Sequence, residues 1–131
     1  MQKLMVTLTV SHSVIALRLW ARLYLLIWLA FVQFFVTAFS EVFGIVYLHF
    51  AVGLAVLALA IMNYRSLMST SAPDRVKRIS RVIPGMAALD GLLGIPLYVF
   101  TQGTAHWAIN ILHLAVALAI IAQASSTATA Y

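Results

Sequence analysis

The sequence has no cysteine and little charge of either sign, with only three acidic residues. The absence of cysteine excludes disulfide bonds, cysteine-ligated zinc, iron–sulfur clusters and thiol catalysis. Charged residues make up 8% of the 131 residues, whereas a soluble domain carries about 25%. Hydrophobic residues account for 64% of the chain, far more than a disordered chain contains. The composition therefore excludes both a water-soluble globule and an intrinsically disordered protein.

Long apolar runs dominate the sequence. About 20 mostly apolar residues are needed for a helix to cross the roughly 30 Å of hydrocarbon in a bilayer. Four runs meet this requirement, at residues 20–39, 43–63, 82–101 and 105–123. They predict an all-α integral membrane protein, a single domain over residues 1–131 that forms a four-helix bundle. We expect residues 4–17 to form an interfacial segment, residues 64–81 a polar loop, and residues 125–131 a frayed end.

The basic residues occupy only two regions of the chain. The eight Lys and Arg residues are Lys3, Arg18, Arg22, Arg65, Arg75, Lys77, Arg78 and Arg81. The positive-inside rule then predicts that both termini and the 64–81 loop are cytoplasmic, and that Glu41 and Gln102 face outward across the cell membrane. The pI of about 10.1 suggests nucleic acid only in a soluble protein. Here the basic residues flank apolar runs, so we expect no nucleic-acid partner.

An internal repeat aligns two histidines. Residues 45–60 (IVYLHFAVGLAVLALA) align with residues 109–124 (INILHLAVALAIIAQA), which places His49 over His113. Both segments run from outside to inside in the predicted topology. The repeat therefore predicts two helical hairpins related in parallel by a pseudo-twofold axis along the membrane normal.

This symmetry would carry His49 and His113 to facing positions at one depth. Haem is a ligand that two opposed histidines in a helix bundle can hold, one on each side of the iron. A small residue follows each histidine by one turn, Gly53 in one case and Ala117 in the other, which leaves room for a flat macrocycle. We therefore expect His49 and His113 to be the metal ligands of a bis-His haem. In the alternative interpretation the histidines are interhelical hydrogen-bond partners, with Asn110 or Asp90 as acceptors.

Four other polar residues are candidates for the site. His106 lies two turns before His113 and is expected either to border the haem pocket or to be an interfacial residue. Asn110, one turn before His113, is a candidate acceptor for its second ring nitrogen. Asp90 is an intramembrane carboxylate, which is costly unless paired. Glu41 is either a solvated loop residue or a catalytic carboxylate.

Three segments resemble a known family. YLHFAVGLAVLALAIM (47–62), ALDGLLGIPLYV (88–99) and INILHLAVALAII (109–121) are similar to the second, third and fourth helices of the heme A synthase family, in which compact archaeal members consist of one four-helix half. The resemblance implies that His49 and His113 are axial haem ligands. It also implies oxidation of the haem O methyl group to the formyl of haem A, with haem O and haem A as substrate and product, in a homo-oligomer.

The sequence departs from the family at two positions near the first histidine. The family has a glutamate three residues before this histidine and an arginine after it, whereas this chain has Val46 and Phe50. Two other functions therefore stay open. One is a small electron-transfer cytochrome b subunit of a respiratory complex with a b-type haem, which needs no catalytic glutamate. The other is a haem-free membrane scaffold or assembly subunit.

Overall fold

The structure is a computed structural model that describes the backbone of residues 2–38, 44–99 and 102–130, and the side chains of residues 18–36, 44–99 and 102–130. Glu41 lies outside the described residues. The described chain forms helices α1 (Gln2–Ala38), α2 (Ile45–Met68), α3 (Asp74–Val99) and α4 (Thr104–Ala130). Each helix contains a stretch long and apolar enough to cross a membrane. The predicted all-α, four-span architecture is therefore confirmed in length and composition.

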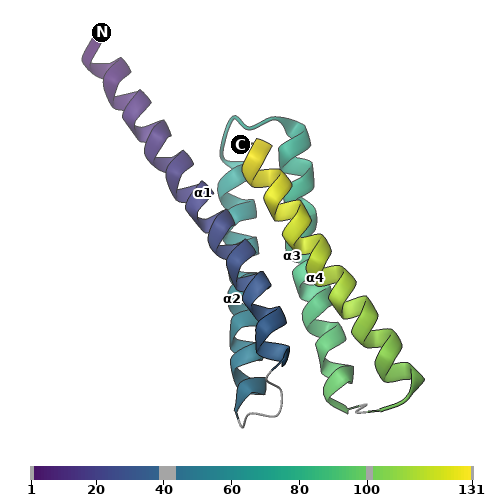
Figure 1. The fold of residues 1–131 in the computed structure, drawn as a ribbon. Coiled ribbons are helices and arrows are strands. Elements are labelled where there is room, and N and C mark those ends of the chain that lie inside the picture. The colour runs from purple at the N-terminus through teal and green to yellow at the C-terminus, as the bar shows by residue number, and fades with distance from the viewer. Residues whose placement is uncertain (1, 39–43, 100–101, 131) are drawn as a thin grey trace.

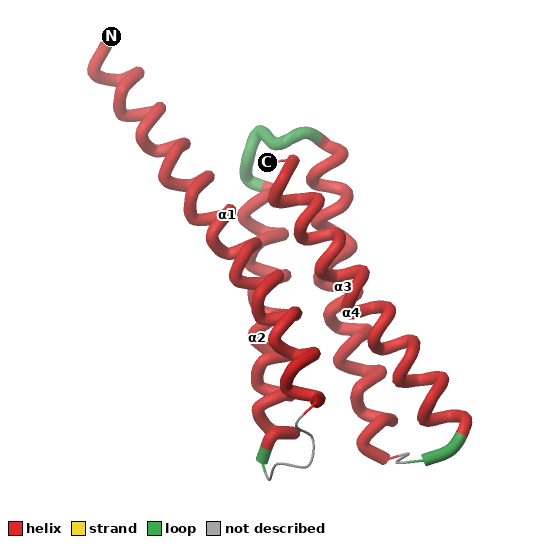
Figure 2. Tube along the Cα trace, in the orientation of Figure 1, coloured by secondary structure: helices red, strands yellow, loops and turns green. Residues whose placement is uncertain are grey.

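The four helices run up and down in an antiparallel bundle (Figure 1). Helix α1 packs against α2 and α4, and α3 packs against the same two helices, so α2 and α4 lie on a diagonal of the bundle. Both termini and the α2–α3 connection lie at one end (Figure 2). We call this the basic end, and we call the opposite end, where α2 and α4 begin, the histidine end.

The predicted 64–81 loop is wrong in its length. Helix α2 continues to Met68 and α3 begins at Asp74, so the connection covers only residues 69–73. Arg, Lys, Leu and Met are good helix formers, and the helices therefore continue past the apolar runs. The carbonyl oxygen of Pro73 accepts the first helical hydrogen bonds from the N–H groups of Val76 and Lys77, at 2.9 and 3.1 Å.

Both ends of the described chain are helical. Residues 4–17 continue α1 as one helix, which extends beyond the rest of the bundle (Figure 1). Residues 125–130, expected to fray, form the last turns of α4, where Thr127 and Ala128 are buried. The Thr127 hydroxyl donates to the Gln123 carbonyl oxygen at 2.9 Å. This bond satisfies the polar group inside the helix, so the small residues can pack into the core.

The tightly packed core lies toward the basic end. One cluster combines Leu26, Ala30, Val56, Ala60, Ile83, Ala87, Ile120 and Ala124, and a second combines Leu19, Leu23, Leu67, Val76 and Ala128. Among the described side chains, none is fully buried in α2 before Val56, in α3 after Ala87 or in α4 before Ile120. The histidine end of these three helices is therefore packed more loosely than the basic end.

Candidate histidine site

The structure brings the two aligned histidines together across the bundle. His49 lies near the start of α2 and His113 in the first half of α4. Their ring centroids are 6.2 Å apart, with 53° between the ring planes. Both side chains are half-buried. Because α2 and α4 are on a diagonal, the rings meet inside the bundle rather than on its surface.

Asp90 of α3 holds the ring of His113. The Nδ1 atom of His113 lies 3.0 Å from the main-chain carbonyl oxygen of Asp90 and 2.9 Å from its carboxylate Oδ1. Both oxygens can only accept hydrogen bonds when the carboxylate is ionised, so Nδ1 carries the proton. In the neutral ring the lone pair is then on Nε2. Asp90 therefore selects the tautomer in which Nε2 is the atom available to a metal.

His49 has no comparable partner. Its Nδ1 atom is buried and forms no hydrogen bond with any described residue. A buried nitrogen without a partner costs about 1–3 kcal/mol. The two histidines are thus equivalent in the repeat but differ in their surroundings, because Asp90 pairs with only one of them.

Two glycines lie close to the histidine pair. A β-carbon at Gly94, one turn after Asp90 on α3, would lie 3.7 Å from Cε1 of His113, which is ordinary van der Waals contact. A β-carbon at Gly53 would lie 3.3 Å from Nε2 of Gln33. The space beside Gly53, expected from the sequence to accommodate a macrocycle, is therefore occupied by the Gln33 side chain of α1.

The remaining predicted residues do not all join the histidine pair. His106 and Ala117 are half-buried on α4. Asn110 is exposed and forms no hydrogen bond within the described residues. Of the two acceptors considered for His113, the structure thus selects Asp90. Glu41, the predicted catalytic carboxylate, lies outside the described ranges.

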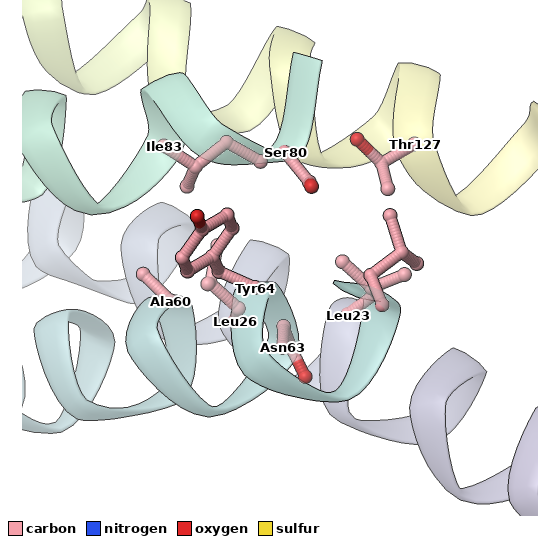
Figure 3. Close-up of a pocket in the computed structure, with 9 residues that line it drawn as sticks. Leu23, Leu26, Ala60, Asn63, Tyr64, Ser80, Ile83 and Thr127 are labelled. Carbon is pink, nitrogen blue, oxygen red and sulfur yellow. The ribbon is translucent and has the colours of Figure 1, made fainter. Parts of the chain in front are cut away.

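A second group of buried polar residues lies toward the basic end and was not identified from the sequence. Asn63 is 4% exposed, and neither its Oδ1 nor its Nδ2 atom has a partner among the described residues. Tyr64, Ser80 and Thr127 line the same cavity of about 10 Å³ (Figure 3), enough space for one water molecule. The sequence feature that could have indicated this group is Asn63, a polar residue at the end of the apolar run 43–63.

The donor set at the histidine site limits its chemistry. No cluster of three or more His, Cys, Asp or Glu residues that could hold a metal ion occurs in the described part of the chain. Two imidazoles alone do not make a four-ligand zinc site, but they match the two axial positions of haem iron. The chain matches no protein-family profile, no curated protein and no solved structure.

Proposed function

We propose that this protein binds one haem through His49 and His113 and acts as a membrane oxidoreductase resembling heme A synthase. The observation that carries the proposal is the 6.2 Å separation of the two ring centroids. A metal–imidazole bond is about 2 Å long and the ligating nitrogen is roughly 1 Å from its ring centre. Two imidazoles on opposite sides of one metal ion would therefore have centroids about 6 Å apart.

The surroundings of the histidines support this proposal. The contact with Asp90 leaves Nε2 of His113 as the free nitrogen, and metal-ligating histidines usually donate their other ring N–H to a carboxylate or a carbonyl. The loose packing at the histidine end leaves side chains that can move apart around a macrocycle. Gly94 keeps the α3 face beside His113 free of a side chain.

Haem, when bound, supplies one-electron redox chemistry. His49 and His113 would hold the haem iron, and Asp90 would keep the ring of His113 oriented. With two histidines as its protein ligands, the haem would be suited to electron transfer rather than to oxygen binding. The small cytochrome b subunit is therefore the second candidate function. The haem A synthase reaction additionally requires a second porphyrin, haem O, as the group that is oxidised.

The location in the cell is part of the same proposal. Both termini and the α2–α3 connection lie at the basic end (Figure 1), and the positive-inside rule assigns that end to the cytoplasm. The histidine end then faces the outer side of the cell membrane. Electron partners or a second copy of the chain would meet the haem from within the membrane or from that side.

The first test is the reduced-minus-oxidised absorption spectrum of the detergent-purified protein, with a pyridine haemochrome assay. We expect a sharp low-spin b-type spectrum in the parent protein, and its loss in His49→Ala and in His113→Ala because each variant removes one axial ligand. His12→Ala, which removes a histidine from the N-terminal segment, is the control and is expected to keep the spectrum.

A colourless parent protein from haem-replete cells would overturn the haem proposal and favour a haem-free scaffold. Retention of the low-spin spectrum in either alanine variant would show that the histidine is not a ligand. If the haem is confirmed, co-expression with a source of haem O distinguishes the two redox functions. Formation of haem A supports the synthase, whereas unchanged haem O with reversible reduction supports electron transfer.

A further inference from the structure

A pocket at the basic end combines three basic residues. The pocket has a volume of about 270 Å³ and is lined by Met68 at the end of α2 and by Asp74, Lys77, Arg78 and Arg81 in the first turns of α3. Residues three and four positions apart share a helix face, which explains why Lys77 and Arg78 both lie near Arg81. The pocket therefore carries three positive charges and one negative charge.

These cations have no carboxylate partner among the described residues. Within the described ranges, neither Asp74 nor any other carboxylate forms an ion pair with Lys77, Arg78 or Arg81. Like charges three and four residues apart destabilise a helix, and an anion bound between them relieves that repulsion. Arginine is also suited to hold phosphate oxygens in pairs. The pocket thus has the chemistry of a phosphate-binding site.

An apolar strip continues from the pocket along α3. Arg78, Val82, Gly85 and Leu89 follow one another at helical spacing and are all exposed. Val82 is 50% exposed and Leu89 is 48% exposed. A β-carbon at Gly85 would meet nothing within 4 Å, so the strip is open in its middle. A free phosphate ion would use only the charged part of this surface, whereas a lipid would use both parts.

We propose that Lys77, Arg78 and Arg81 bind the phosphate of an anionic phospholipid whose acyl chain lies along Val82, Gly85 and Leu89. The basic residues are located where the apolar part of α3 begins, so the headgroup and the chain meet their matching surfaces at the same time. Basic pockets between helices at the cytoplasmic surface are suited to anionic headgroups. The basic residues thus bind a lipid as well as setting the orientation of the protein.

Two matched variants test the charged part of the site. Arg78→Gln and Arg75→Gln each remove one of the eight basic residues, but only Arg78 lines the pocket. Each protein is placed in nanodiscs of phosphatidylcholine with a minor fraction of phosphatidylglycerol, and the lipid retained after transfer to detergent is counted by native mass spectrometry. We expect Arg78→Gln to lower retained phosphatidylglycerol about fivefold. Arg75→Gln should change it by less than about twofold, because Arg75 does not line the pocket.

A third variant tests the apolar strip. Gly85→Leu fills the open middle of the strip and favours the helix, so we expect it to lower phosphatidylglycerol retention while the protein stays folded by circular dichroism. Equal losses of retained phosphatidylglycerol in Arg78→Gln and Arg75→Gln would overturn the proposal. They would indicate general electrostatic attraction of anionic lipid rather than a defined binding site. Displacement of the lipid by inorganic phosphate at matched ionic strength would also overturn it, in favour of a free-phosphate site. The histidines lie at the other end of the bundle, so the assay does not require haem.

Discussion

At the scale of single residues, the contact between Asp90 and His113 joins α3 to α4 beside the second histidine. The Asp90 and His113 side chains are 20% and 17% exposed, so the pair is largely protected from solvent. A carboxylate in an apolar bundle is costly unless a partner compensates it. The imidazole supplies that compensation, and the carboxylate in turn fixes the direction of the ring.

The Asp90→Asn variant tests the role of this pair. The asparagine amide has nearly the same shape as the carboxylate but no charge. It therefore orients the ring of His113 less strongly and makes Nε2 a weaker electron-pair donor to the metal. We expect haem affinity, measured by titration of the apoprotein with haemin, to fall about 10–100-fold. The haem midpoint potential should rise, because a less basic ligand stabilises the ferric state less. Asp74→Asn makes the same chemical change at the basic end and should alter neither quantity. An unchanged affinity and potential in Asp90→Asn would exclude a positioning role for Asp90.

At the scale of helices, the end of α4 contributes to the core although its sequence is small and polar. Thr127 is fully buried and Ala128 is 7% exposed. Hydroxyl groups on this turn bond to carbonyl oxygens of the same helix, as in the contact between Thr129 and Ser125 at 3.0 Å. Small residues with internally satisfied hydroxyls let helices approach closely in a membrane protein. The end of α4 should therefore matter for stability.

A matched pair of substitutions measures this contribution. Thr127→Asp introduces a carboxylate at a buried position, whereas Ser126→Asp introduces it at the exposed neighbouring position. We expect Thr127→Asp to lower the free energy of unfolding by about 3 kcal/mol or more, since an unpaired buried charge is strongly unfavourable. Ser126→Asp should change it by no more than about 0.5 kcal/mol. The measurement is denaturant titration of both variants in the same detergent. Equal effects would mean that the last turns of α4 do not pack against the bundle.

At the scale of the whole molecule, the basic residues and the histidine pair lie toward opposite ends of the bundle. The connection between α2 and α3 is flanked by five of the eight basic residues, namely Arg65, Arg75, Lys77, Arg78 and Arg81. Arg22 of α1 reaches the same end and donates to the Ser66 hydroxyl at 2.8 Å. The histidine pair lies toward the other end. Under the positive-inside rule this polarity predicts a cytoplasmic basic end.

Cysteine labelling tests the orientation. The chain has no cysteine of its own, so Ser71→Cys and Gln102→Cys each introduce a single reporter, and both positions are exposed. In intact cells, a membrane-impermeant maleimide should label Gln102→Cys. Ser71→Cys should react only after permeabilisation, because positive loops stay in the cytoplasm. The reverse pattern would place the histidine site at the cytoplasmic side and contradict the proposed topology.

The amino-acid sequence alone was enough to predict four membrane-spanning helices and the histidine pair. Apolar runs of about 20 residues have few alternatives to a helix, because a bilayer offers no partners for backbone polar groups. The aligned His49 and His113 were found from an internal repeat. The helix ends were not predicted, because residues such as Arg65, Arg75 and Thr127 continue a helix without being apolar.

Tertiary structure decided which side chains meet. Spacing along α4 suggested Asn110 as the acceptor for His113, but the rotation of α3 against α4 places Asp90 there and leaves Asn110 exposed. The packing of α1 against α2 similarly places Gln33 beside Gly53. Sequence therefore determined how many helices are long and apolar enough to cross a membrane and which two histidines are equivalent in the repeat, since both follow from local sequence. The partners of those residues depend on helix rotation and register, which only the packed bundle specifies.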